Sequence, residues 1–242
     1  MALDYTLRYP KPLISGQLIR RYKRFLADVE LDDGQIITAH STNTGSMMGC
    51  SAPGSAVYLS PADNPKRKLR YTWEMIKVGR SWVGVNTQIP NRLVTAAFEQ
   101  GRIPQFAGYD RHRREVKYGK NSRIDLLLED DEGPKKRPPC YVEIKNVTLK
   151  RGKAAFFPDA VTARGKKHLD ELASMAALGH RAVIFFFIGR VDCEEFRPAD
   201  DIDPLYGETL RTVMQHGVEA LAYRARFDRK GICLQEELPI HV

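Results

Sequence analysis

The sequence predicts an α/β chain in two parts, a small antiparallel β-barrel followed by a mixed α/β domain. Three observations support this division. Up to residue 88, short strand-like segments alternate with turn sequences such as DDG, APGS and ADNP. From residue 89 onward, helical spacing of apolar residues alternates with strands, and one strand, in RAVIFFFIGR, is apolar throughout. With 242 residues, of which 43% are hydrophobic, the chain can bury a core in each part.

The first part, residues 1–88, is expected to be all β. Its strands are predicted at residues 13–19, 24–31, 35–40, 56–59, 69–78 and 82–86. Many short strands at this spacing are typical of a closed barrel, and a five-stranded barrel of the oligonucleotide-binding type fits the length. We expect most of its aromatic rings in the core, because large apolar rings gain most by burial.

The second part, residues 89–242, is expected to form a mixed sheet with helices. Its helices are predicted at about 89–100, 159–178 and 204–215, and its strands at about 123–129, 140–148, 182–188, 218–227 and 232–238. The apolar strand should lie in the middle of the sheet, covered on both faces. Asp159 is expected to cap the N-terminus of its helix, where a carboxylate accepts hydrogen bonds from free backbone N–H groups.

Positive charge is clustered along the chain, which has a net charge of +8. Between Arg102 and Arg123 there are seven Lys or Arg residues and only two acids. Clustered basic side chains suit a polyanion, because each neutralised phosphate releases a counterion, so DNA is the expected partner, bound mainly through phosphates. The alternative is a solvated basic surface with no partner. The candidate DNA contacts are Arg20, Arg24, Lys66, Arg67, Lys68, Arg123, Arg164 and Lys167.

Other classes of protein fit the sequence poorly. The longest apolar run, residues 182–188, is too short to cross a bilayer, and MALDYTLRYP has no signal-peptide pattern, so we expect a cytoplasmic protein with no membrane partner. The four cysteines form no Cys-x-x-Cys pair, so buried free thiols are expected rather than zinc ligands or disulfides. The sequence leaves the oligomeric state open, with a homodimer among the options.

Three charged residues interrupt two of the predicted apolar strands. Side chains alternate between the faces of a strand, so Glu143 and Lys145 share one face of CYVEIKNV. Asp125 lies in RIDLLLED, and a hairpin through residues 129–139 would bring its carboxylate beside that of Glu143. Two carboxylates so close repel each other unless a divalent cation offsets their charge. We therefore expect Asp125 and Glu143 to bind Mg²⁺ or Mn²⁺.

Such a site suits phosphodiester hydrolysis. Mg²⁺ prefers oxygen ligands and keeps several waters, so two carboxylates, a backbone carbonyl and waters would satisfy it. Lys145 could then orient the attacking water or stabilise developing negative charge. In the alternative interpretation, Glu143 and Lys145 are surface neighbours on an edge strand and Asp125 makes an ordinary ion pair. His168, in the following helix, either faces this site or lies on the helix surface, and the surface is the expected position.

The order of these motifs resembles that of a known nuclease superfamily. Asp125, then Glu143-x-Lys145 on the next strand, then a helix and a buried strand are similar to the PD-(D/E)XK, or restriction-endonuclease-like, superfamily. Further motifs span almost the full length of the chain: NTGSM at 43–47, NPKRK at 64–68, KYGKNSRIDLLL at 117–128, YVEIKNVTL at 141–149, FPDAVTARGKKHLDEL at 157–172 and DP at 203–204. In these stretches the chain as a whole resembles the sugar fermentation stimulation protein family.

This resemblance implies an N-terminal oligonucleotide-binding-like barrel, a C-terminal restriction-endonuclease-like domain, DNA binding and a link to the regulation of sugar catabolism. By motif position, Asp125, Glu143 and Lys145 would be the catalytic residues. Glu115 stands where nucleases of this fold often add an acid from the first helix or its exit, as a further metal ligand. Three functions remain open: a magnesium-dependent deoxyribonuclease, a DNA-binding regulator that keeps the fold without cutting, and a small nucleotide or sugar-phosphate hydrolase.

Overall fold

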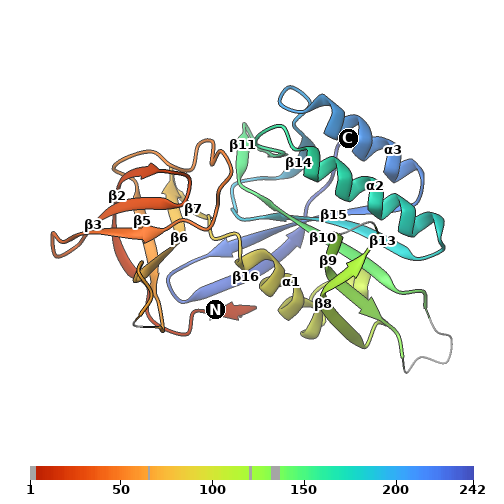
Figure 1. The fold of residues 1–242 in the computed structure, drawn as a ribbon, viewed down its shortest axis with the longest axis horizontal. Coiled ribbons are helices and arrows are strands. Elements are labelled where there is room, and N and C mark those ends of the chain that lie inside the picture. The colour runs from red at the N-terminus through yellow and green to blue at the C-terminus, as the bar shows by residue number, and fades with distance from the viewer. Residues whose placement is uncertain (1–3, 65, 120–121, 132–136) are drawn as a thin grey trace.

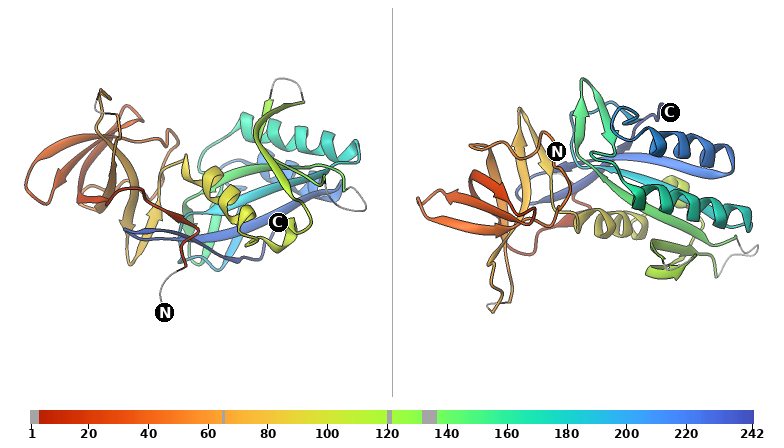
Figure 2. Two further views of the ribbon diagram at one scale, coloured as in Figure 1. Left: turned by 90° about the horizontal axis from the view of Figure 1, so that it is seen from below. Right: turned by 45° about the horizontal axis from the view of Figure 1, so that its top comes forward.

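The computed structural model describes residues 4–64, 66–119, 122–131 and 137–242 and confirms the two-part architecture. A β-barrel lies at one end of the molecule, and a mixed sheet flanked by helices makes up the rest (Figure 1). The turned views show the same division, with the barrel joined to one end of the sheet (Figure 2).

The barrel confirms the predicted five-stranded ring. Over the described residues the five strands of the ring are β2 (Ile14–Tyr22), β3 (Leu26–Leu31), β4 (Ile36–His40), β5 (Ala56–Pro61) and β6 (Tyr71–Val78). A sixth strand, β7 (Ser81–Gly84), pairs with β6 outside the ring. These strands follow the order β4-β3-β2-β5-β6-β7, and a parallel bridge between His40 and Thr72 closes the ring from β4 to β6. Burial of the apolar core, which includes the fully buried Trp73, favours this closed form.

The second domain is built on a sheet with the order β1-β16-β15-β13-β10-β9-β8 in the part of the chain described. Its central strands β10, β13 and β15 are parallel, and the pairs toward both edges are antiparallel. The strands are β1 (Leu7–Arg8), β8 (Arg111–Tyr118), β9 (Ser122–Glu129), β10 (Cys140–Val147), β13 (Arg181–Ile188), β15 (Val218–Phe227) and β16 (Gly231–Glu237). The apolar strand is thus central, as predicted, because its side chains are buried on both faces.

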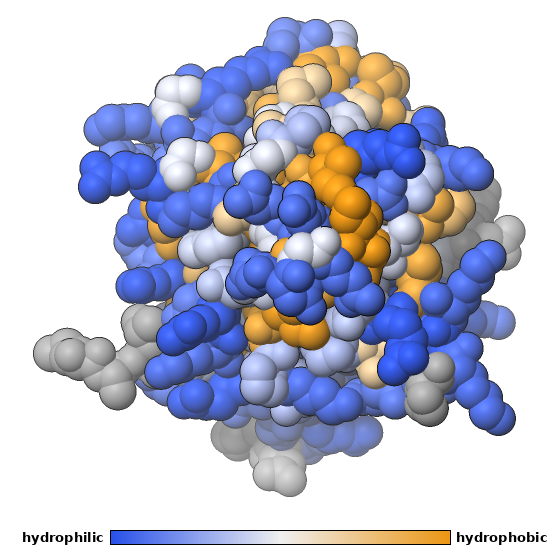
Figure 3. Space-filling view, turned by 90° about the vertical axis from the view of Figure 1, so that its left-hand side faces the viewer, coloured by the Kyte–Doolittle hydropathy of each residue, from blue (hydrophilic) through white to orange (hydrophobic). Residues whose placement is uncertain are grey.

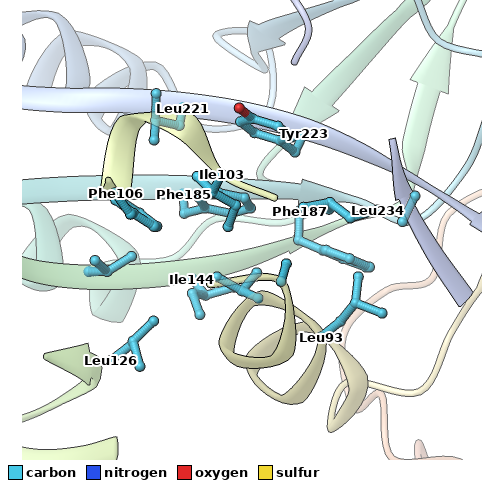
Figure 4. Packing of buried hydrophobic residues seen from close by; sticks show 14 of the residues in the cluster. Leu93, Ile103, Phe106, Leu126, Ile144, Phe185, Phe187, Leu221, Tyr223 and Leu234 are labelled. Atoms are coloured by element: carbon cyan, nitrogen blue, oxygen red, sulfur yellow. The ribbon is translucent and has the colours of Figure 1, made fainter. Parts of the chain in front are cut away.

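Helices cover both faces of this sheet. Helix α1 (Ile89–Glu99) packs on one face, and α2 (Ala163–Ala177) and α3 (Pro204–Gln215) pack on the other (Figure 1). Figure 4 shows Leu93 of α1 against Ile144 and Phe187 of the sheet. No helix among the residues described is long and apolar enough to span a membrane. The four cysteines are buried and free, as predicted.

Some elements were not predicted. Strand β8 is missing from the sequence interpretation, as is a small sheet of β11 (Leu149–Arg151), β12 (Ala154–Phe157) and β14 (Glu195–Pro198). Strand β1 pairs with β16, so the chain passes through the mixed sheet before it enters the barrel. Part of the predicted hairpin loop, residues 132–136, lies outside the described residues.

The two domains meet where glycines allow a close approach. The backbone N of Gly84, in β7, donates a hydrogen bond to the carbonyl of Gly189 at 2.8 Å. A Cβ at Gly84 would overlap the ring of Phe227, so only glycine fits there. This contact fixes the barrel against the ends of the central strands.

Candidate active site

The candidate site forms where strands β9 and β10 separate. Their antiparallel ladder ends at the pair Val142 and Leu126. One step further, the opposed residues are Asp125 and Glu143. Instead of another ladder bond, Asp125 Oδ2 accepts a hydrogen bond from the backbone N of Ile144 at 2.8 Å. The structure therefore brings together the two carboxylates that the hairpin was expected to join.

Neutral donors hold the Asp125 carboxylate. Its second oxygen, Oδ1, accepts a hydrogen bond from Asn91 Nδ2, in the first turn of α1, at 2.8 Å. Burial and then the negative charge of Glu143 raise the pKa of Asp125 to about 6. A shift of this direction and cause is typical of a carboxylate that shares a buried site with another carboxylate. The charge of Lys145 and the two hydrogen bonds lower the pKa of Asp125 but do not outweigh these effects.

Glu143 is more deeply buried, with 3% of its surface exposed. Its Oε1 accepts a hydrogen bond from Lys145 Nζ at 2.7 Å and also contacts His168 Nδ1. Burial opposes ionisation of Glu143, but the hydrogen bond from His168 and the charge of Lys145 outweigh it, so the pKa of Glu143 lies below its usual value. Its other oxygen, Oε2, is buried without a hydrogen-bond partner among the described residues. A cation would stabilise such an oxygen, because a buried polar atom without a partner is costly.

The surface interpretation of Glu143 and Lys145 is wrong. Strand β10 lies between β9 and β13, so it is an interior strand. The Lys145 side chain is only 12% exposed. Both side chains point toward α2, where His168 meets them.

His168 lies inside the site, so its expected place on the helix surface is also wrong. Its side chain is 8% exposed. Because ionised Glu143 Oε1 can only accept, His168 Nδ1 must carry a proton, and Nε2 is left to accept from Arg164 Nε at 3.3 Å. Hydrogen bonds therefore run from Arg164 through His168 to Glu143 Oε1. They fix the orientation of the carboxylate and so the position of Oε2.

The donor set fits a hard divalent cation. The Asp125 carboxylate and Glu143 Oε2 are oxygen ligands of the kind that Mg²⁺, Mn²⁺ and Ca²⁺ prefer. Among the described residues, no group of three or more His, Cys, Asp or Glu side chains is placed to hold a metal ion. Backbone carbonyls and waters would therefore complete the shell, as is common for Mg²⁺.

Glu115 lies on strand β8, not at a helix exit. The neighbouring pairs, Arg114 with Leu126 and Val116 with Ile124, set it opposite Asp125 in the ladder. Its side chain is exposed, and its backbone adopts a φ of 54°, which is uncommon for glutamate. Its role as a third metal ligand stays a prediction.

The three predicted DNA contacts of the second domain differ in how they are connected to the carboxylates of Asp125 and Glu143. Arg164 joins the site through His168. Lys167, on the same helix, lies 3.6 Å from Glu171. Arg123 is exposed on β9. Of these three side chains, Arg164 alone is linked to the carboxylates by hydrogen bonds among the described residues.

The predicted contacts in the barrel lie in two places. Arg20 on β2 pairs with Asp28 at 2.9 Å, and Arg24 is exposed in the turn that follows β2. Lys66, Arg67 and Lys68 lie between β5 and β6; the two lysines are exposed, and Arg67 is half-buried. The structure does not gather these side chains around the carboxylates.

Asp159 does not cap helix α2, contrary to expectation. The N-cap is Thr162, whose hydroxyl accepts from the backbone N of Gly165 at 2.9 Å, because it directly precedes the first helical residue. Asp159 instead accepts hydrogen bonds from Ser46 Oγ at 2.8 Å and from the backbone N of Met47 at 3.2 Å. The NTGSM loop of the barrel is thereby tied to the segment just before α2.

Sequence reasoning missed two residues of the site. His168 had a usable signal, since it lies four and seven residues before Leu172 and Met175 on the buried face of α2. The sequence gives no such signal for Asn91, because its contact with Asp125 joins residues that are 34 positions apart. It depends on how α1 packs on the sheet.

Comparison with known families agrees with both domains. Residues 88–231 match the family described as the sugar fermentation stimulation protein RE domain. Residues 19–85 match the family described as the SfsA N-terminal OB domain. The second match agrees with the closed barrel described above.

Individual relatives extend this similarity over the full chain. The sugar fermentation stimulation protein homolog of Geobacter sulfurreducens is 56% identical over 96% of this chain and 97% of its own length. The Geobacter metallireducens homolog is 54% identical over 97% and 99%, respectively. The solved structure of Pyrococcus furiosus SfsA in complex with Ca²⁺ is 27% identical, with a TM-score of 0.88 over 99% of this chain and 100% of that one. The chain belongs to the sugar fermentation stimulation protein family.

Proposed function

We propose that this protein is a divalent-metal-dependent nuclease that acts on DNA, with a PD-(D/E)XK arrangement of Asp125, Glu143 and Lys145. One observation carries the proposal: two carboxylates face each other where β9 and β10 separate, and Glu143 Oε2 is buried without a partner among the described residues. Mg²⁺ or Mn²⁺ is the proposed ion. The solved complex of Pyrococcus furiosus SfsA with Ca²⁺ supports this choice, because Ca²⁺ also prefers oxygen ligands.

Each residue of the site has a defined task in this proposal. When bound, the ion would activate a water and stabilise charge on the phosphodiester. Asp125 and Glu143 hold it, and His168 keeps Glu143 oriented. Lys145 Nζ, now on Glu143 Oε1, has further N–H donors for a phosphate oxygen or the attacking water. Arg164 can contact a neighbouring phosphate from the first turn of α2.

The barrel supplies a surface for the rest of the DNA. Figure 3 looks at the barrel end, where hydrophilic side chains predominate. Arg21 donates hydrogen bonds to the carbonyls of Asn43 and Gly45, and the loop that contains them is tied to Asp159. This links the turn that carries Arg24 to the start of α2. We propose that the DNA backbone follows this path, with an affinity that falls steeply as salt increases.

The test is a cleavage assay with the full-length protein. Single-stranded and double-stranded DNA would be incubated with Mg²⁺ or Mn²⁺, beside Lys145→Ala and an EDTA control. We expect metal-dependent cleavage by the wild type alone. Cleavage by Lys145→Ala at the wild-type rate would rule out the proposed site.

A second candidate is a DNA-binding regulator of sugar catabolism that keeps the nuclease fold without cutting. One observation favours it: Lys145 Nζ is already engaged by Glu143 and lies 3.0 Å from His168 Nδ1. The names of the relatives agree with such a role. Salt-sensitive DNA binding by the wild type, without cleavage in Mg²⁺ or Mn²⁺, would decide for the regulator.

A further inference from the structure

A separate cavity lies in the seam between the barrel and the mixed sheet. Its volume is about 310 Å³, within the range of about 300–1,000 Å³ that is usual for small-molecule sites. Residues 7–10 around β1, residues 60–64 at the end of β5 and just beyond it, and the first turn of α1 contribute to its wall. None of the three proposed catalytic residues lines it.

Three arginines line this cavity: Arg8, Arg67 and Arg92. None of them makes a salt bridge to a described residue. Arg67 donates to Thr72 Oγ1 at 3.0 Å, and Arg8 lies over the ring of Tyr5 at 4.7 Å. Three guanidinium groups around one cavity create a positive potential that attracts an anion.

The carboxylates in the wall do not cancel this charge. Asp63 pairs with Lys11 at 2.7 Å. Glu74 accepts hydrogen bonds from Ser60 Oγ at 2.6 Å and from Asn86 Nδ2 at 2.9 Å. The charge of Arg92 also acts on Glu74, and Arg67 Nη2 lies 3.0 Å from His40 Nδ1. None of the three arginines has a salt-bridge partner among the described residues, so each can still pair with an anionic group.

A buried polar atom in the wall also lacks a partner. The hydroxyl of Tyr9 is buried and makes no hydrogen bond to any described residue. Because this hydroxyl is inaccessible to solvent, it does not face the open cavity, and recognition of a ligand falls to the arginines. The cavity is also larger than a bare phosphate requires.

We propose that this cavity binds a phosphate ester with the chemistry of a nucleotide, its phosphate held by the arginines. The ligand is either a free mononucleotide or the phosphorylated end of a DNA strand. Bidentate arginine contacts are the usual means of recognising such a group. The inference does not depend on the metal site, although Arg92 directly follows Asn91, which contacts Asp125.

Calorimetry on the full-length protein in EDTA tests this inference without cleavage. The probes are adenosine monophosphate, adenosine, and a short single-stranded oligonucleotide with or without a 5′-phosphate. We expect adenosine monophosphate to bind, adenosine to give no signal, and Arg92→Gln to weaken binding at least about tenfold. Arg80→Gln, an exposed arginine outside the cavity, is the matched control and should bind like the wild type.

The arms of the experiment separate the two sources of the phosphate. If only the phosphorylated oligonucleotide gains affinity over its unphosphorylated form, and Arg92→Gln removes that gain, the occupant is a strand end. Should circular dichroism show that Arg92→Gln does not fold, Arg8→Gln replaces it. The inference is overturned if the phosphate changes the affinity of neither probe, or if the folded arginine variants bind like the wild type.

Discussion

Two carboxylates, the half-buried Asp125 and the buried Glu74, have similar surroundings although they lie in different domains. Asp125 of the mixed sheet and Glu74 of the barrel each accept a hydrogen bond from an asparagine amide, Asn91 and Asn86 respectively. Each also accepts one from a second neutral donor. Burial raises the pKa of both groups.

Their charged neighbours differ. A cation lowers the pKa of each group, Lys145 for Asp125 and Arg92 for Glu74, but Asp125 also has a neighbouring carboxylate, that of Glu143, which raises its pKa. A buried carboxylate is therefore not by itself a metal site in this molecule. We propose the pair of Asp125 and Glu143 as a metal site, because two neighbouring negative charges need compensating positive charge, of which the described side chains supply only a part.

The largest expected effect concerns cleavage. Glu143→Gln keeps the size of the side chain and removes the charge of a proposed metal ligand. We expect cleavage with Mg²⁺ or Mn²⁺ to slow roughly a thousandfold or more. DNA binding in EDTA should persist, which would show that the variant is folded. A cleavage rate equal to that of the wild type would contradict the assigned role.

The second prediction concerns stability without metal. The pKa of Asp125 rises from an ordinary 3.8 to about 6, so the folded chain holds this proton more tightly than the unfolded chain. The resulting stabilisation is present below the unfolded pKa and is lost as pH rises through about 6. Asp125→Asn loses one of the two hydrogen bonds that the carboxylate accepts, at a cost that does not depend on pH, so its free energy of unfolding relative to the wild type should be higher at about pH 8 than near pH 4, by up to about 3 kcal/mol.

Urea denaturation in EDTA at several pH values measures this difference. Glu74→Gln is the comparison. Its pH-dependent change in the free energy of unfolding should lack the contribution of a second carboxylate, because none raises the pKa of Glu74. A difference between Asp125→Asn and the wild type that stays the same from pH 4 to pH 8 would show that the pair is not strained in the absence of metal.

The third prediction concerns the stability of the folded protein in the presence of Mn²⁺. At a concentration about a hundredfold above its Kd, Mn²⁺ should stabilise the wild type by about 2.7 kcal/mol. Asp125→Asn should lose this stabilisation, whereas Glu74→Gln should retain it because it faces no second carboxylate. Urea denaturation with and without Mn²⁺ measures the stabilisation of each variant by the ion. Equal stabilisation of Asp125→Asn and Glu74→Gln by Mn²⁺ would contradict the prediction.

The smallest effect is expected at His168. His168→Ala removes the donor that orients Glu143, and we expect Mn²⁺ affinity to weaken about tenfold. His168→Asn keeps an N–H donor close to the position of Nδ1 and should recover most of the affinity. Calorimetry measures both. A purely structural role would lower stability in both variants without this recovery of Mn²⁺ binding.

Local patterns made most of the fold predictable. The helices at Ile89–Glu99 and Pro204–Gln215 and the buried strand at Arg181–Ile188 follow from apolar periodicity and length. Strand β8 did not, because its sequence RHRREVKY lies at a sheet edge, is largely exposed and lacks apolar alternation. The pairing of Leu7–Arg8 with β16 joins the two ends of the chain, which no local pattern encodes.

The site was predictable where it depended on one hairpin. The juxtaposition of Asp125 and Glu143 follows from strand pairing alone, since the partners lie on consecutive strands of the chain. The contacts of Asn91, Asp159 and His168 depend on how helices and the barrel pack on the sheet. Packing of this kind is set by tertiary structure, so local rules placed Asp159 and His168 wrongly.

The position of a bound ion tests the proposed metal site most directly. Anomalous diffraction from crystals grown with Mn²⁺ would locate it without reference to activity. We expect Mn²⁺ between Asp125 and Glu143, with Glu143 Oε2 as a ligand at roughly 2.1–2.2 Å. Mn²⁺ bound elsewhere, or none at this pair at saturating concentration, would contradict the proposed site.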